Sequence, residues 1–247
     1  MPETRTIAIE VLRYQPEGPA EPYVQRFDIP YTDDMSVLQG LQHVKDEIDG
    51  TLTFRWSCRM AICGSCGMMI DGVPRLACRT FLRDFAPGPV RIEALDHFPI
   101  ERDLVVDAGD FIDKLPRIRP WIEPREARTL AEGEFRQSPA QLERIESFSH
   151  CINCMLCYAA CPQYGLDNKF LGPGLTSLML RYNEDSRDGG RDARMALAAS
   201  DEGVFGCTAV GYCSEVCPKA VDPANAVNRT KTDAALGWFG NFLHRGD

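Results

Sequence analysis

Apolar side chains recur at every second position near the start of the chain, which is the period of a strand with one buried face. Between Thr6 and Tyr14, isoleucine and valine fall on one side, and alanine and glutamate on the other. A second strand-like segment runs from Tyr23 to Ile29, beyond a turn region from Pro16 to Pro22. The pattern predicts two antiparallel strands that pair as a hairpin.

The apolar period then changes to that of a helix. Val37, Leu41, Val44 and Ile48 follow Ser36 at spacings that place them on one helical face. A serine in front of such a segment can accept a hydrogen bond from a backbone N–H of the first turn. We therefore expect a helix that Ser36 caps and that carries one apolar face.

Strand-like segments return after a loop rich in cysteine. A short strand is expected from Pro74 to Cys78, after the Asp71-Gly72 turn, and a last one from Val90 to Leu95. Strand, strand, helix, cysteine loop and strand is the order of a β-grasp ferredoxin of the plant type. We assign residues 1–105 to this domain.

The remainder of the chain has helical signals and many prolines. Residues 106–138 form a proline-rich connecting region, with one helix expected around Asp103 to Leu115. Residues 139–247 are expected to be wholly helical, which makes the fold class α+β. Helices are predicted to begin at the Ser138-Pro139 and Asp222-Pro223 pairs and to span Pro173–Tyr182 and Arg191–Ala199.

Cysteine is the chain's main chemical feature, with eleven residues in two sets. The first set has the spacing of plant-type [2Fe–2S] proteins, in which a loop gives three ligands and a later segment the fourth. Gly64 and Gly67 would allow positive φ angles and close backbone approach around a cluster. A zinc knuckle remains the alternative for a C-x2-C pair. The first set is Cys58, Cys63, Cys66 and Cys78.

The second set contains two copies of a cysteine-rich run that ends in Cys-Pro, as in two-cluster bacterial ferredoxins. The last cysteine of each run ligates the other cluster in such proteins. A [4Fe–4S] site would then consist of Cys151, Cys154, Cys157 and Cys217. A second site would have only Cys161, Cys207 and Cys213.

Val210 stands where the missing ligand of this last site is expected. Valine cannot ligate iron, so two chemistries remain open. One is a [3Fe–4S] cluster, with the branched apolar side chain sealing the empty corner. The other is a [4Fe–4S] cluster with an open iron that binds substrate, as in iron–sulfur dehydratases. The chain's lack of a substrate site favours the first.

Composition limits the function classes. The net charge is −9, without a basic patch, which argues against nucleic acid as a partner. No apolar run approaches the length of about 18 residues that a membrane span needs. The N-terminus has no signal peptide, so we expect a chain in the cytosol or on the cytosolic face of a membrane. Glu184, Asp185 and Arg187 are expected to form a solvated helix end.

Several longer strings together resemble the iron–sulfur subunit of fumarate reductase and succinate dehydrogenase. The resemblance covers nearly the whole chain. It rests on Arg55–Gly67 (RWSCRMAICGSCG), Pro99–Asp107 (PIERDLVVD), Tyr182–Asp188 (YNEDSRD) and Cys217-Pro218-Lys219.

The resemblance implies an electron relay between two partners. A flavoprotein with covalent FAD would carry out the dicarboxylate chemistry, so this chain has no catalytic residue of its own. A membrane anchor would bind quinone, and the resemblance leaves open whether it also holds haem b. Electrons would pass between flavin and quinone through [2Fe–2S], [4Fe–4S] and [3Fe–4S] clusters. The resemblance also places a quinone-binding lysine at Lys231. Such a subunit would be peripheral on the cytoplasmic face of a prokaryotic inner or plasma membrane.

Two details favour the fumarate reductase type within the family. Some succinate dehydrogenases have aspartate where this chain has Cys66. Ubiquinone-type members often carry a tryptophan pair where this chain has Tyr164-Gly165-Leu166. A physiological succinate dehydrogenase remains an alternative. So does an iron–sulfur subunit of a heterodisulfide reductase-like enzyme.

Overall fold

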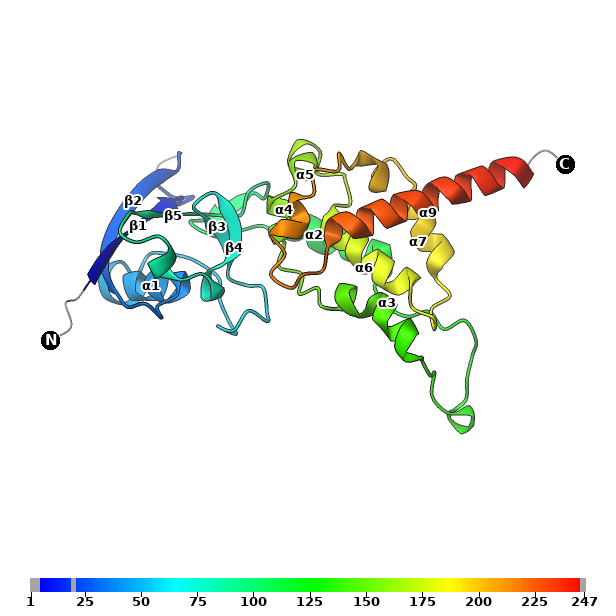
Figure 1. Cartoon of the computed structure of the whole chain (residues 1–247). Helices are drawn as coiled ribbons and strands as arrows, with labels where there is room; N and C mark the ends of the chain where they lie inside the picture. Colours follow the sequence, from blue (N-terminus) through cyan, green and yellow to red (C-terminus); the bar gives the residue numbers. More distant parts are fainter. Residues whose placement is uncertain (1–4, 19–20, 245–247) are drawn as a thin grey trace. The chain divides into compact units, whose positions relative to one another are not determined.

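The chain consists of two compact units. A computed structural model describes residues 5–18 and 21–244, and Figure 1 labels its main helices and strands. Met1–Ala108 and Ile152–Ala160 form the first unit, here called the sheet unit. Gly109–Cys151 and Cys161–Asp247 form the second, the helical unit. The segment Ile152–Ala160, which we expected in the helical domain, is part of the sheet unit.

A mixed five-stranded sheet is the centre of the sheet unit (Figure 1). Its strand order is β2-β1-β5-β3-β4, with β1 and β5 parallel and the other neighbours antiparallel. The predicted hairpin and last strand are both present, and the α+β class is confirmed. The strands are β1 (Arg5–Arg13), β2 (Tyr23–Tyr31), β3 (Gly67–Ile70), β4 (Val73–Leu76) and β5 (Val90–Glu93).

The predicted first helix is confirmed as α1 (Val37–His43). Ser36 and Gln39 form a capping box, in which each side chain bonds the other residue's backbone N–H. The helix then widens into a π-helical turn, Val44–Ile48, closed by the bond from Asp49 N–H to the Val44 carbonyl. Because a π-turn rotates later residues away from the α-helical face, Ile48 is 51% exposed, and its place on the apolar face was wrongly predicted.

The helix predicted from Asp103 begins later than expected. Asp103 has a φ of 47° and lies in the turn of a small ribbon. The ribbon pairs β6 (Ile100–Arg102) with β7 (Val105–Val106), and helix α2 (Gly109–Lys114) follows it. Residues 103–106, which were predicted to begin the helix, instead form the turn and the second strand of this ribbon. The sheet unit also contains α4 (Leu156–Ala159) and short 3₁₀ turns at Ala77–Arg79 and Leu82–Asp84.

The helical unit has the helices that the sequence predicted at its caps. Ser138 caps α3 through a capping box with Gln141, and prolines open α6 and α9. A buried core of Phe148, Leu180 and Val221 joins α3, α6 and the segment before α9. Besides α2, the helices are α3 (Pro139–Ser149), α5 (Pro162–Leu166), α6 (Pro173–Asn183), α7 (Arg191–Ala198), α8 (Tyr212–Glu215) and α9 (Pro223–His244), with 3₁₀ turns at Leu115–Ile118, Leu130–Glu132 and Val204–Gly206.

Across residues 5–18 and 21–244, no helix combines the length and the apolar character that a transmembrane helix requires.

Candidate metal centres

The first cysteine set lies in a loop whose backbone N–H groups point at sulfur. Cys58 Sγ accepts hydrogen bonds from the N–H groups of Met60, Ile62 and Cys63 at 3.4, 3.3 and 3.3 Å. Ala61 N–H donates to Cys78 Sγ at 3.3 Å, so the 3₁₀ turn after β4 reaches the loop. N–H donors of this kind stabilise thiolates, as cluster ligands require.

The loop reaches this shape through three left-handed residues, of which Arg59 and Ala61 were not predicted from the sequence. Arg59, Ala61 and Gly64 have φ angles of 59°, 57° and 74°. Gly67, in contrast, is the first residue of β3 and is not among the described residues that have a positive φ. The prediction of positive φ was therefore right for Gly64 and wrong for Gly67. Close approach does hold at Gly67, because a Cβ there would lie 3.2 Å from the Cys154 carbonyl oxygen.

The thiols of the first set have unequal proton affinities. Hydrogen bonds from the Cys58 backbone and from Ser65 lower the pKa of Cys63 to about 6. Burial raises the pKa of Cys66 to about 12, and the nearby Cys78 and Cys63 also influence it. A thiol must lose its proton to ligate a metal. The donor set fits an iron–sulfur cluster, which would replace the protons of thiols that already lie together.

A second cysteine segment packs directly against this loop within the sheet unit. A Cβ on Gly64 would lie 2.8 Å from Cys154 Cβ and 2.9 Å from its Cα. A small cavity of about 70 Å³ beside them is lined by Arg55, Asn153 and Met155, among others. Asn153 and Met155 have φ angles of 53° and 62°, which turn the Cys154 segment toward the loop.

The four cysteines expected at the [4Fe–4S] site are distributed over both units. Cys154 and Cys157 belong to the sheet unit, with Cys157 on α4. Cys151 and Cys217 belong to the helical unit, where both pack against the core of Phe148, Leu180, Val221 and Ala226. Cys217 Sγ accepts a hydrogen bond from Val221 N–H at 3.4 Å.

The third set is brought together inside the helical unit. Burial, together with the nearby Cys161 and Cys207, raises the pKa of Cys213 to about 11. Cys207 Sγ accepts a hydrogen bond from Ala209 N–H at 3.3 Å. Val210 follows in the same turn and is 62% exposed. That its side chain seals the empty corner of a three-iron cluster stays a prediction.

Lys231 of α9 lies beside this third set. Its Nζ donates to the Cys207 carbonyl oxygen at 2.7 Å. The lysine that the family resemblance singled out is therefore next to a cysteine loop, although twenty-four positions separate the two residues in the chain.

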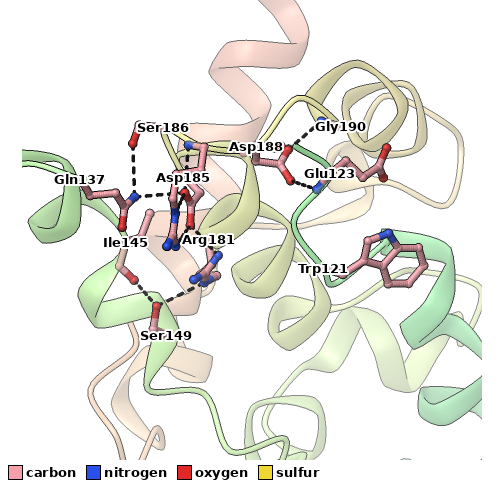
Figure 2. A network of polar contacts seen from close by, with 12 residues as sticks. Trp121, Glu123, Gln137, Ile145, Ser149, Arg181, Asp185, Ser186, Asp188 and Gly190 are labelled. Carbon is pink, nitrogen blue, oxygen red and sulfur yellow. Dashed lines mark hydrogen bonds and ion pairs between the residues drawn. The ribbon is translucent and has the colours of Figure 1, made fainter. Parts of the chain in front are cut away.

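The helical unit contains a buried network of ion pairs that was not predicted from the sequence. Asp185 and Asp188 are 1% and 2% exposed, so the prediction of a solvated helix end is wrong. Figure 2 shows both carboxylates surrounded by donors. Asp185 pairs with Arg181 and Arg187 at 3.0 and 2.8 Å.

Asp188 is equally enclosed. It accepts from both terminal nitrogens of Arg194 at 2.6 and 2.9 Å. Figure 2 shows the two further bonds that it accepts, from the backbone N–H groups of Glu123 and Gly190. The arginine donors lie within six positions of the carboxylates they bind, whereas Gln137 and Glu123 belong to distant segments that only the tertiary fold brings near. The closely spaced acidic and basic residues of Tyr182–Asp188 were the only available sequence signal.

Comparison with known proteins agrees with this geometry. Residues 8–113 match the family described as a 2Fe-2S iron-sulfur cluster binding domain, and residues 144–218 match the 4Fe-4S dicluster domain. The fumarate reductase iron-sulfur subunit of Mycobacterium tuberculosis (strain CDC 1551 / Oshkosh) is 55% identical over 93% of each chain. That of Haemophilus influenzae is 50% identical over 98% of each.

A solved structure shares the fold. A chain of the Mycobacterium smegmatis Sdh1 complex in the apo form superposes with a TM-score of 0.86 at 27% identity, covering 94% of this chain and 96% of that one. The match extends over both the sheet unit and the helical unit. The chain belongs to the family of iron–sulfur subunits of fumarate reductase and succinate dehydrogenase, and its function is electron transfer within that oxidoreductase.

Proposed function

We propose that this subunit relays electrons between the covalent FAD of a flavoprotein partner and a quinone held by a membrane anchor. The observation that carries the proposal is the cysteine inventory. Eleven cysteines divide into sets of four, four and three with none left over. The members of the first set lie together, and so do those of the third.

Each set would hold one cluster. Cys58, Cys63, Cys66 and Cys78 would hold [2Fe–2S], and Cys151, Cys154, Cys157 and Cys217 would hold [4Fe–4S]. Cys161, Cys207 and Cys213 would hold [3Fe–4S]. Clusters of these types accept and release single electrons when bound. The N–H groups that point at sulfur in the first and third sets would stabilise the thiolate ligands.

A three-iron cluster is the better occupant of the third site. Val210 offers no ligand at the position where the repeated run predicts one, so a fourth iron would lack a protein thiolate. An open, catalytic iron would require a substrate pocket beside Val210, whereas this exposed side chain lies on a turn between Ala209 and Gly211. We therefore assign the dicarboxylate chemistry to the flavoprotein partner.

Location and direction follow from the same proposal. The subunit would be held peripherally on the cytoplasmic face of a prokaryotic membrane by anchor subunits. Quinone would bind near Lys231, whose ammonium group lies beside Cys207 and can donate to a quinone oxygen. Cys66 and the Tyr164-Gly165-Leu166 segment favour fumarate reduction as the direction.

The intact membrane complex provides the test. We would measure fumarate reduction with a menaquinol analogue and succinate oxidation with a ubiquinone analogue, and record EPR spectra of all clusters. Three distinct cluster signals and fast menaquinol-driven fumarate reduction support the proposal. Dominant succinate oxidation with ubiquinone would reverse the assigned direction. Absence of the three-iron signal from the oxidised complex would overturn the cluster assignment.

A further inference from the structure

A buried lysine of the helical unit is linked through Tyr164 to the third cysteine set. The Lys114 side chain is only 7% exposed, and its Nζ forms an ion pair with Asp110 Oδ2 at 2.7 Å. It also donates to the backbone carbonyl oxygens of Asn168 and Phe170. These contacts join α2 to the chain segment that follows α5. A charged lysine is rarely buried without such a complete set of acceptors.

Tyr164 connects this ion pair to Cys161. Its hydroxyl donates to Asp110 Oδ2 at 2.6 Å, and Lys114 Nζ lies 5.3 Å from the centre of its ring. The backbone N–H groups of Tyr164 and Gln163 hydrogen-bond to the Cys161 sulfur. One residue thus contacts both the buried charges and a cysteine of the third set.

Buried charges such as those of Lys114 and Asp110 change the reduction potential of a nearby redox group. Reduction adds one negative charge, which a fixed cation stabilises and a fixed anion destabilises, and screening by solvent is weak around buried groups. Cluster potentials depend on local charge and on hydrogen bonds to sulfur. Lys114 and Asp110 would therefore shift a nearby cluster's potential in opposite directions.

We propose that Lys114 and Asp110 set the reduction potential of the third cluster, with Tyr164 linking both charges to Cys161. Lys114 raises the potential and Asp110 lowers it. The inference rests on the proposed function, because it requires a [3Fe–4S] cluster on Cys161, Cys207 and Cys213. A purely structural pair would only hold α2 against the segment after α5.

The test is a redox titration of the purified membrane complex, followed through the three-iron EPR signal. At the parent's midpoint potential, Lys114→Met should lower the ratio of reduced to oxidised cluster at least about threefold. Asp110→Asn should raise that ratio by a similar factor. Shifts of both variants in the same direction, or no shift in either, would overturn the proposal.

Further variants separate folding from tuning. The double variant Asp110→Asn with Lys114→Met removes both charges and should return the potential close to that of the parent; a potential that stays shifted contradicts charge tuning. Arg191→Met removes one partner of the exposed Arg191–Asp233 pair and should leave the potential unchanged. If Lys114→Met loses the cluster, the nearly isosteric Asp110→Asn variant still decides the sign.

Failure of the proposed function would look different. A parent complex whose oxidised spectrum contains no three-iron signal refutes the cluster assignment before any variant is made. A parent with the signal, and variants without opposite shifts, refutes only the role of Lys114 and Asp110.

Discussion

Lys231 Nζ donates to the backbone carbonyl oxygen of Cys207 at 2.7 Å, which joins helix α9 to the third cysteine set. An ammonium group has three donors, so this bond leaves capacity for a second acceptor. We expect Lys231→Leu to lower quinol turnover about tenfold, because one hydrogen bond from a charged group contributes roughly 1.5 kcal/mol. Steady-state rates with a menaquinol analogue would measure the loss.

The same variant should keep all three EPR signals, since no cysteine is altered. Lys45 is a matched control, because it also donates to backbone carbonyls, those of Gly50 and Leu52, in the sheet unit. Lys45→Leu should leave quinol turnover unchanged. Normal quinol kinetics in Lys231→Leu would remove this lysine from the quinone site.

Gly64→Ala should prevent assembly of the [2Fe–2S] cluster. The residue has a φ of 74°, and a Cβ would lie 2.8 Å from Cys154 Cβ and 2.9 Å from Cys154 Cα. Cys154 Cα and Cβ cannot move away by a change of side-chain rotamer. The clash can therefore be removed only if the backbone of the Gly64 loop or of the Cys154 segment shifts. We expect the variant's [2Fe–2S] EPR signal to fall to less than about a tenth of the parent's, because ligand geometry is specific.

Gly72 separates backbone strain from this clash. It has a φ of 72°, nearly that of Gly64, but nothing lies within 4 Å of an added Cβ. Gly72→Ala should cost about 1 kcal/mol of stability and retain a full cluster signal. Equal loss of the cluster in both variants would show that φ, and not the contact with Cys154, is what matters at Gly64.

Local chemistry made much of this fold predictable. Several sequence signals determine structure only within a few residues of their own position. They are the alternating residues of β1, the serine caps at Ser36 and Ser138, and the proline that opens α9. Cysteine spacing likewise grouped the thiols of the first set, because one short loop contains three of them.

Features that depend on distant residues escaped prediction. Asp185 was predicted to be a surface charge, because its partner Gln137 is forty-eight positions away and is brought near only by the fold. The exposure of Ile48 has a local cause, because the hydrogen bond from Asp49 N–H to the Val44 carbonyl spans five residues instead of the four of an α-helix. The period of apolar residues predicts neither the burial of ion pairs nor such a change of hydrogen-bond register.

Val210→Cys should change the type of the third cluster. The added thiol would stand where the repeated cysteine run predicts a fourth ligand, in a turn that already places Cys207 Sγ near backbone N–H groups. We expect conversion toward [4Fe–4S] and a lower reduction potential, because the cluster gains an iron and an anionic ligand. EPR of the oxidised complex should lose the three-iron signal.

Val210→Ser is the control, as it gives a polar side chain of similar reach without a thiolate. It should retain the three-iron signal. Persistence of that signal in Val210→Cys would mean that something other than the missing ligand determines the cluster type.

Asp188→Asn should destabilise the helical unit and change its response to acid. The Asp188 side chain is 1% exposed and pairs with the wholly buried side chain of Arg194. Removing one partner of such a pair leaves an uncompensated buried charge, which costs about 3–5 kcal/mol. Urea unfolding at neutral pH would measure the loss.

The acid response follows from the pKa of Asp188. Burial opposes the charged form, but bonds from Arg194, Glu123 and Gly190 prevail and hold the pKa below its usual value. A depressed carboxylate pKa stabilises the fold above the unfolded value, near pH 4, and this contribution is lost as pH falls through the folded value. Parent stability should therefore decline below about pH 4 more steeply than that of Asp188→Asn. Asp233→Asn, at the half-exposed Arg191 pair, should follow the parent curve. Parallel curves for the parent and Asp188→Asn would show that Asp188 does not carry this acid sensitivity.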